Sequence, residues 1–185
     1  MCGRFAYNAE QITLWAKAVL GVTLDYATNL DVRPSQKIIA IASNKQPVFL
    51  SWGIQPSWSK HLIINAKAET VAEKKTFKDA FAHNRCLIPC SGWYEWRDEG
   101  GPRKQKYYFS ATNREPLLMA GIWFDDKGAK NLVTLTTDAN QDCLPYHARM
   151  PVFIALNEMN PWFQEHDVPE LLMPMENGLT LIEKA

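Results

Sequence analysis

Short apolar and aromatic runs separated by turn residues are the feature that most constrains the fold of this 185-residue chain. The runs have the length and the β-branched and aromatic composition of strands, and most are too short for helices. Two of the connections, Asp98–Pro102 and Asp125–Gly128, carry strong hairpin-turn signals. The sequence therefore predicts strands over residues 37–42, 46–52, 85–89, 93–97, 105–110, 117–124, 131–136, 152–156 and 179–182.

Three segments instead show helical character. Residues 10–20 place their apolar side chains on one helical face, and residues 73–83 predict a shorter amphipathic helix. A short helix is also expected over residues 157–164, where Pro161 limits its length. Few helices and many short strands indicate an α+β class, with a mostly antiparallel sheet curled into a barrel-like core. We expect a single domain spanning residues 1–185.

Composition limits which cellular compartment and which binding partners are expected. The formal net charge is zero, so no overall field attracts nucleic acid or a membrane surface, although local patches can still form. A secretory signal and an apolar run long enough to cross a bilayer are both missing, which predicts a cytoplasmic protein with no membrane partner. In a reducing compartment Cys86, Cys90 and Cys143 are expected to be ordinary buried thiols. We also expect a monomer.

Metal binding is disfavoured by ligand spacing. Cys86 and Cys90 are four residues apart, as are Cys143 and His147. On a strand such a pair is separated by about 13 Å, too far for two ligands of one zinc ion. The sequence also has no glycine-rich phosphate loop. We therefore predict neither a metal nor a cofactor.

The second residue is a cysteine, Cys2, and this position carries distinctive chemistry if Met1 is removed. Cys2 would then present a free α-amine beside its own thiol. The reference pKa of an α-amine is about 7.7–8.0, so roughly a tenth of it is uncharged at neutral pH. A neutral amine can form a Schiff base with an aldehyde, and the adjacent thiol can close that imine into a thiazolidine. The alternative is that a cysteine follows the initiator by chance.

Three further polar residues stand in apolar or aromatic surroundings, where an unpaired polar group would be costly. Asn65 follows an apolar run and is either a turn residue or a fixed hydrogen-bonding group in a pocket. Glu95 lies between aromatic residues, and it is a proton carrier if it points inward or a solvated carboxylate if it points outward. His147 lies in a loop bracketed by prolines, where it is either a surface residue or a proton donor.

Local basic and aromatic residues suggest nucleic-acid binding. Arg4, Lys67, Lys75 and Arg85 lie near the candidate site residues in sequence, and Trp58 follows a short polar loop. Cations paired with phosphates and an exposed aromatic ring stacked on a base are typical of single-strand binding. The alternative is a core tryptophan beside a solvated lysine-rich helix face.

Taken together, several segments resemble the SRAP (SOS response-associated peptidase) family and occur in the family's order. The matching segments are Met1–Phe5, Trp52–Gly53, Ile64–Thr70, Arg85–Pro89, Ser91–Trp96 and His147–Pro151. The resemblance implies the family's curled-sheet fold and binding of single-stranded DNA. It also implies a covalent cross-link between the N-terminal cysteine and abasic sites, as a thiazolidine that shields the lesion.

The resemblance also implies roles for four residues. Cys2 would supply the amine and the thiol to the C1′ aldehyde of the opened deoxyribose, and Asn65 would orient the amine or the sugar. Glu95 would carry protons during imine formation and ring closure. His147 would protonate the ring oxygen of the sugar.

The DNA contacts follow by the same resemblance. Arg4, Lys67 and Lys75 would hold phosphates, and Trp58 would stack on a base. Lys67 stands where the family usually has arginine, so the phosphate contact loses its bidentate geometry. Asp31 would repel phosphate unless Arg33 compensates it.

Two other functions remain open from the residues alone. One is an N-terminal-cysteine peptidase or amidase, in which Cys2 is acylated and Asn65 contributes to an oxyanion hole. The other is a noncovalent reader of single-stranded or modified DNA. An AP-lyase activity could accompany the cross-linking reaction, since a Schiff base at C1′ promotes β-elimination.

Overall fold

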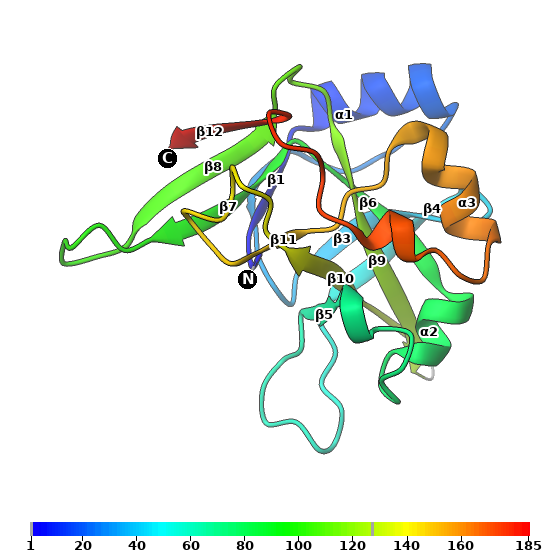
Figure 1. The fold of residues 1–185 in the computed structure, drawn as a ribbon. Helices are drawn as coiled ribbons and strands as arrows, with labels where there is room; N and C mark the ends of the chain where they lie inside the picture. The colour runs from blue at the N-terminus through cyan, green and yellow to red at the C-terminus, as the bar shows by residue number, and fades with distance from the viewer. Residues whose placement is uncertain (1, 127) are drawn as a thin grey trace.

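A closed five-stranded barrel forms the centre of the computed structural model, which describes residues 2–126 and 128–185 (Figure 1). Its strands follow the order β10-β4-β3-β6-β9, and β9 pairs with β10 to close the ring. All of these pairings are antiparallel except that between β10 and β4. The barrel strands are β3 (Lys37–Ala42), β4 (Pro47–Trp52), β6 (Arg85–Cys90), β9 (Leu117–Asp126) and β10 (Ala129–Asp138).

A second, antiparallel sheet of five strands lies beside the barrel. Its order is β12-β8-β7-β1-β2, and the long β7–β8 hairpin extends from the body of the fold (Figure 1). At the start of β7, a Cβ on Gly92 would lie 2.2 Å from the carbonyl oxygen of Phe109, so only glycine fits there. The strands are β1 (Phe5–Tyr7), β2 (Asn29–Val32), β7 (Gly92–Arg97), β8 (Gln105–Ala111) and β12 (Thr180–Lys184).

Strand β10 continues past the barrel and pairs with two short segments that hold or adjoin candidate site residues. Its second half pairs in parallel with β5 (Asn65–Lys67) and antiparallel with β11 (Arg149–Pro151). One long strand therefore brings two short segments together that are about 80 residues apart in sequence.

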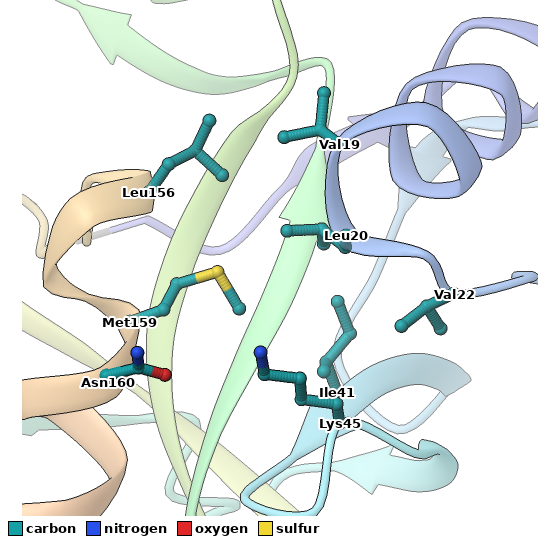
Figure 2. Close-up of a pocket in the computed structure, with 8 residues that line it drawn as sticks. All are labelled: Val19, Leu20, Val22, Ile41, Lys45, Leu156, Met159 and Asn160. Carbon is teal, nitrogen blue, oxygen red and sulfur yellow. The ribbon is translucent and has the colours of Figure 1, made fainter.

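Helices occupy the periphery of the barrel. Asn8 caps α1 (Ala9–Trp15) through a side-chain bond to the Gln11 amide, and α1 continues into a π-helical turn. A cavity of about 160 Å³ separates this turn from α3 and the β3–β4 hairpin, and the Lys45 side chain extends toward it (Figure 2). The helical elements are α1, the π-turn Ala16–Leu20, α2 (Lys78–His83), α3 (Met159–Gln164) and the 3₁₀ turns Ala68–Thr70, Leu156–Glu158 and Pro169–Leu172.

The predicted fold class is confirmed, and several boundaries are corrected. The strand expected over 152–156 is instead β11, three residues earlier, because the backbone leaves β10 after Pro151. The helix expected over 73–83 begins only at Lys78. Strands β1, β2 and β5 were not predicted, since each is too short to show a period. Within the described residues, no helix is long and apolar enough to span a membrane.

Candidate active site around Cys2

Cys2 lies just before β1, close to Glu95 of β7 in the second sheet and to Cys90 of the barrel strand β6. Phe5 pairs with Trp93 of β7, and the amide of Tyr94 donates to the carbonyl of Arg4 at 3.0 Å. Extending this register by two residues brings Gly3 opposite Glu95, so the start of the chain runs alongside β7. The Cys2 side chain is 1% exposed, and its Sγ lies 3.7 Å from the Arg4 carbonyl oxygen. Met1 lies outside the described residues, so its removal stays a prediction.

Asn65 is the first residue of β5, and it contacts Cys2 directly. Its Nδ2 donates a hydrogen bond of 3.0 Å to the Cys2 carbonyl oxygen. Its Oδ1 accepts a hydrogen bond of 2.5 Å from the hydroxyl of Thr134, the residue opposite it on β10. The Cys2 carbonyl can only accept, so it requires the amide nitrogen, and the Thr134 hydroxyl donates to the amide oxygen on the other side, so the two contacts together fix the orientation of the amide. Asn65 is therefore a fixed hydrogen-bonding group.

The Thr134 hydroxyl has a second acceptor within reach, the Ile64 carbonyl at 3.3 Å. That carbonyl already accepts from the indole of Trp52 and from the backbone amide of Thr134, each at 3.0 Å. The hydroxyl carries one proton, and the shorter contact is to Asn65. The buried Trp52 and Thr134 thus hold Ile64 and Asn65 in place where β5 begins.

Glu95 points inward from β7 and is 4% exposed. Burial raises the pKa of its carboxyl group from 4.5 to about 7. A carboxyl group with this pKa exists in both protonation states near neutral pH, which is the property of a proton carrier. The alternative of a solvated carboxylate is wrong for this strand.

The thiol of Cys2 is held in its protonated form. Burial raises its pKa well above the ordinary value, and the nearby charge of Glu95 and the Cys90 thiol raise it further. Thiolate is the nucleophilic form of cysteine, so this environment suppresses direct attack by sulfur. Cys86, Cys90 and Cys143 are buried as expected and are free thiols.

His147 reaches this region through the segment that follows β10. The adjacent Tyr146 ring packs edge-on against Tyr107, 4.6 Å between centroids, and Tyr107 is the β8 partner of Glu95. His147 Nδ1 lies 2.9 Å from the Arg149 amide nitrogen and 3.1 Å from the Arg149 carbonyl oxygen, so the Arg149 backbone fixes the orientation of the imidazole ring. Burial lowers the pKa of His147, which favours the neutral ring at pH 7.

Arg149 ties the His147 segment to β5 and β10. Its guanidinium makes two hydrogen bonds to Glu69, at 2.6 and 2.8 Å, and one of 2.6 Å to Asp138. It also donates to the Thr136 carbonyl at 2.5 Å. A bidentate carboxylate pair fixes the guanidinium plane. The loop bearing His147 is therefore anchored to the same strand that orients Asn65.

The residues predicted to contact DNA differ in how exposed their side chains are. Lys67 and Lys75 are exposed, and Lys67 is two residues from Asn65 in β5 and so projects from the same face. Trp58 is 67% exposed, in the loop that joins β4 and β5 and extends beyond the barrel (Figure 1). An exposed tryptophan rules out the alternative of a core ring.

Arg4 is less available than the lysines, because Asp31 lies 2.6 Å from its guanidinium. Asp31 also pairs with Arg33 at 2.5 Å. Two arginines therefore surround the one carboxylate, and the local balance stays positive. The ion pairs with Arg4 and Arg33 neutralise the Asp31 carboxylate, so it should not repel phosphate.

Arg85 corrects the sequence-based prediction. Its side chain is 5% exposed, beneath α3. Its nitrogens donate to four backbone carbonyls at 2.7–3.0 Å, and its guanidinium lies 4.5 Å from the ring centroid of Phe81. Every face of the guanidinium is occupied by protein. Arg85 is a structural residue, and its assignment to phosphate binding was wrong.

Two residues that the sequence did not predict, Thr134 and Arg149, position the candidate site residues. Thr134 and Arg149 orient Asn65 and the His147 loop, yet in sequence Thr134 is one of several strand threonines. Their roles depend on pairing between distant segments, for which the sequence carries no local signal. Among the residues that the structure describes, no group of three or more metal-ligating side chains gathers.

Known proteins are similar to this chain in sequence. Residues 1–183 match the family model described as SOS response associated peptidase (SRAP). The abasic site processing protein YoaM of Bacillus subtilis is 30% identical over 200 residues, covering 95% of this chain and 87% of YoaM. The abasic site processing protein YedK of Escherichia coli is 28% identical, covering 89% of this chain and 80% of YedK.

Structural similarity extends over the whole chain. A crystal structure of a protein from Bordetella bronchiseptica superimposes with a TM-score of 0.84 at 20% identity, covering 100% of this chain and 99% of that one. At this identity the likeness establishes the fold. The family match over residues 1–183 and the relative that is 30% identical over 200 residues show the family: the chain belongs to the SRAP family.

Proposed function

We propose that this protein binds single-stranded DNA and captures abasic sites covalently through Cys2 once Met1 has been removed. The observation that carries the proposal is the hydrogen bond from Asn65 to the Cys2 carbonyl, next to a buried carboxyl group whose pKa is about 7. The abasic site processing relatives support the same substrate.

The reaction begins with the Cys2 amine. The neutral amine adds to the C1′ aldehyde of the opened deoxyribose, and loss of one water gives an imine. The sulfur then adds to C1′ while its proton passes to nitrogen, which closes a thiazolidine. The raised pKa of the Cys2 thiol favours this order, because the protonated sulfur cannot compete with the amine for the aldehyde.

The neighbouring groups serve proton transfer and positioning. Glu95 accepts a proton from the adding amine and returns it to the departing water, a cycle for which a pKa of about 7 is well matched. Asn65 holds the Cys2 backbone so that both the amine and the thiol can reach the C1′ atom of the bound sugar. His147 donates a proton to the ring oxygen of the sugar and promotes ring opening.

DNA contacts are expected around this site. Lys67 and Lys75 pair with phosphates, Arg4 contributes through its free nitrogens, and Trp58 stacks on a neighbouring base. The shielding of the lesion follows from the linkage, since the opened sugar no longer presents an aldehyde.

The peptidase alternative requires a Cys2 thiol with a different protonation state and exposure. A cysteine hydrolase needs an accessible thiolate, whereas burial and the Glu95 charge raise the pKa of the Cys2 thiol. The environment thus supports amine chemistry over acyl transfer.

The test uses mature protein whose loss of Met1 is verified by intact mass. Incubation with a single-stranded oligonucleotide containing one abasic site should give a denaturation-resistant adduct, with the summed mass less one water. Cys2→Ser should give no durable adduct, and an undamaged oligonucleotide serves as the substrate control. Failure of the mature wild type to form the adduct would refute the proposal. Cys2-dependent peptide cleavage without DNA would favour the peptidase.

A further inference from the structure

A groove of about 720 Å³ lies on the barrel apart from the Cys2 site. Its walls are the β8–β9 connection, the segment after β11 and the segment that leads from the 3₁₀ turn Pro169–Leu172 to β12, drawn in red in Figure 1, and Trp15 at the end of α1 also lines it. None of the candidate site residues lines it. Its volume is within the range of about 300–1,000 Å³ usual for ligand sites.

The lining of the groove is largely apolar and partly exposed. Leu156 is 43% exposed, Met173 62% and Leu179 44%, and all three border this one groove. Phe153 and Met175 lie in the same lining. Large apolar side chains gathered in one concave site mark a binding surface, and methionines adapt to partners of varied shape.

The charged residues of the groove all have the same sign. Glu115, Glu158, Glu170 and Glu176 line it, and among the described residues no lysine, arginine or histidine does. The whole chain has twenty acidic and twenty basic residues, so this one-sided lining departs from the composition. Within residues 2–126 and 128–185, none of the four forms an ion pair. They leave a negative rim without a cationic partner.

The spacing of the carboxylates decides what kind of cation suits them. Among the described residues, no group of three or more acidic, histidine or cysteine side chains is placed to hold a metal ion, so the four carboxylates do not form a shared metal site. Nucleic acid is excluded by repulsion between these carboxylates and phosphates. Separate negative charges around an apolar lining complement a peptide in which cationic and apolar side chains are interspersed.

We propose that this groove binds a segment of a partner protein in which large apolar residues are flanked by lysines or arginines. The apolar side chains enter the lining around Phe153 and Met175, and the cations pair with the glutamates at the rim. Such a contact attaches a partner while the Cys2 site stays open to DNA.

The probe is a phage-displayed library of random twelve-residue peptides selected on the full chain. Enriched peptides are synthesised and their affinities measured by fluorescence anisotropy. Glu170→Lys with Met173→Lys reverses charge and removes apolar surface inside the groove. Glu10→Lys with Leu14→Lys makes the same change on the exposed face of α1, where Leu14 is 66% exposed. Because all four side chains are exposed, both variants should fold, which circular dichroism verifies.

Basic and apolar peptides should be enriched, and the groove variant should bind them at least tenfold more weakly while the α1 variant binds normally. Covalent capture of abasic DNA should be the same in both variants, which separates this proposal from the reaction at Cys2. Three results would overturn it: no enrichment, enrichment of peptides without cations, or equal binding by both variants. Self-association abolished in the groove variant alone, seen by sedimentation velocity, would show a second copy as the occupant and overturn it too.

Discussion

Replacing Thr134 with valine removes the hydroxyl that orients the Asn65 amide and changes little else. Valine has nearly the same shape, and position 134 is fully buried, so the backbone of β10 should stay in place. The Asn65 oxygen loses its 2.5 Å donor, and the amide can then turn its nitrogen away from the Cys2 carbonyl. One hydrogen bond of this kind contributes about 1 kcal/mol. That loss corresponds to roughly a fivefold slower reaction.

The assay is single-turnover capture of an abasic oligonucleotide by mature protein, followed on denaturing gels. Asn65→Ala removes the amide itself, and loss of an oriented donor at a reacting centre costs on the order of 10²-fold. Thr134→Ser keeps the hydroxyl and should react within about twofold of the wild type, by the hydrogen-bond reasoning above. Urea denaturation of each variant separates a rate effect from unfolding.

A double variant gives the sharpest refutation. If Thr134 acts only through Asn65, adding Thr134→Val to Asn65→Ala should slow capture no further. An additional fivefold loss in that background would show that Thr134 works by another route. A wild-type rate for Thr134→Val alone would show that the amide needs no orientation.

Further predictions concern two buried charged residues and two residues of the expected DNA surface. Arg85→Met should lower the free energy of unfolding by about 3–5 kcal/mol in urea, because four carbonyls lose their donor, and should leave DNA affinity unchanged. Glu95→Gln should gain stability relative to the wild type as the pH rises from about 4.5 to 7. Burial raises the folded-state pKa of Glu95, so the folded protein holds this proton more tightly than the unfolded chain, and ionisation costs at most about 3 kcal/mol. In anisotropy titrations, Trp58→Ala should weaken single-strand binding by about 1–3 kcal/mol at unchanged salt slope, whereas Lys75→Ala should reduce that slope by about one.

Each of these predictions has a result that contradicts it. Arg85→Met with normal stability and weaker DNA binding would restore the phosphate assignment. A stability difference for Glu95→Gln that does not change with pH would mean that Glu95 has an ordinary pKa when folded. A Trp58→Ala variant that binds like the wild type would remove the stacking contact.

Local sequence pattern was sufficient for much of the fold. The β3–β4 hairpin and the strands from β6 to β10 follow from alternating apolar runs and turn residues, with end positions within a few residues. The pattern failed for β1, β2 and β5, each three or four residues long, because pairing to a neighbour forms such strands rather than their own composition. Curling could be expected, but the closure between β9 and β10 could not be read from sequence.

By itself, the sequence determined which functional groups the candidate site contains. They are a cysteine at position 2, and an amide, a carboxyl group and an imidazole in segments ordered as in one family. Only the tertiary structure decided how these groups are held. Glu95 points inward and has a pKa near neutrality because β7 faces the core, and Asn65 meets Cys2 because β10 pairs with β5. The tertiary structure also shows that Arg85, expected at the surface, is buried and donates hydrogen bonds to carbonyls at the end of α3. Side-chain type is encoded locally, whereas burial, and with it protonation and partner choice, depends on segments brought together from distant parts of the chain.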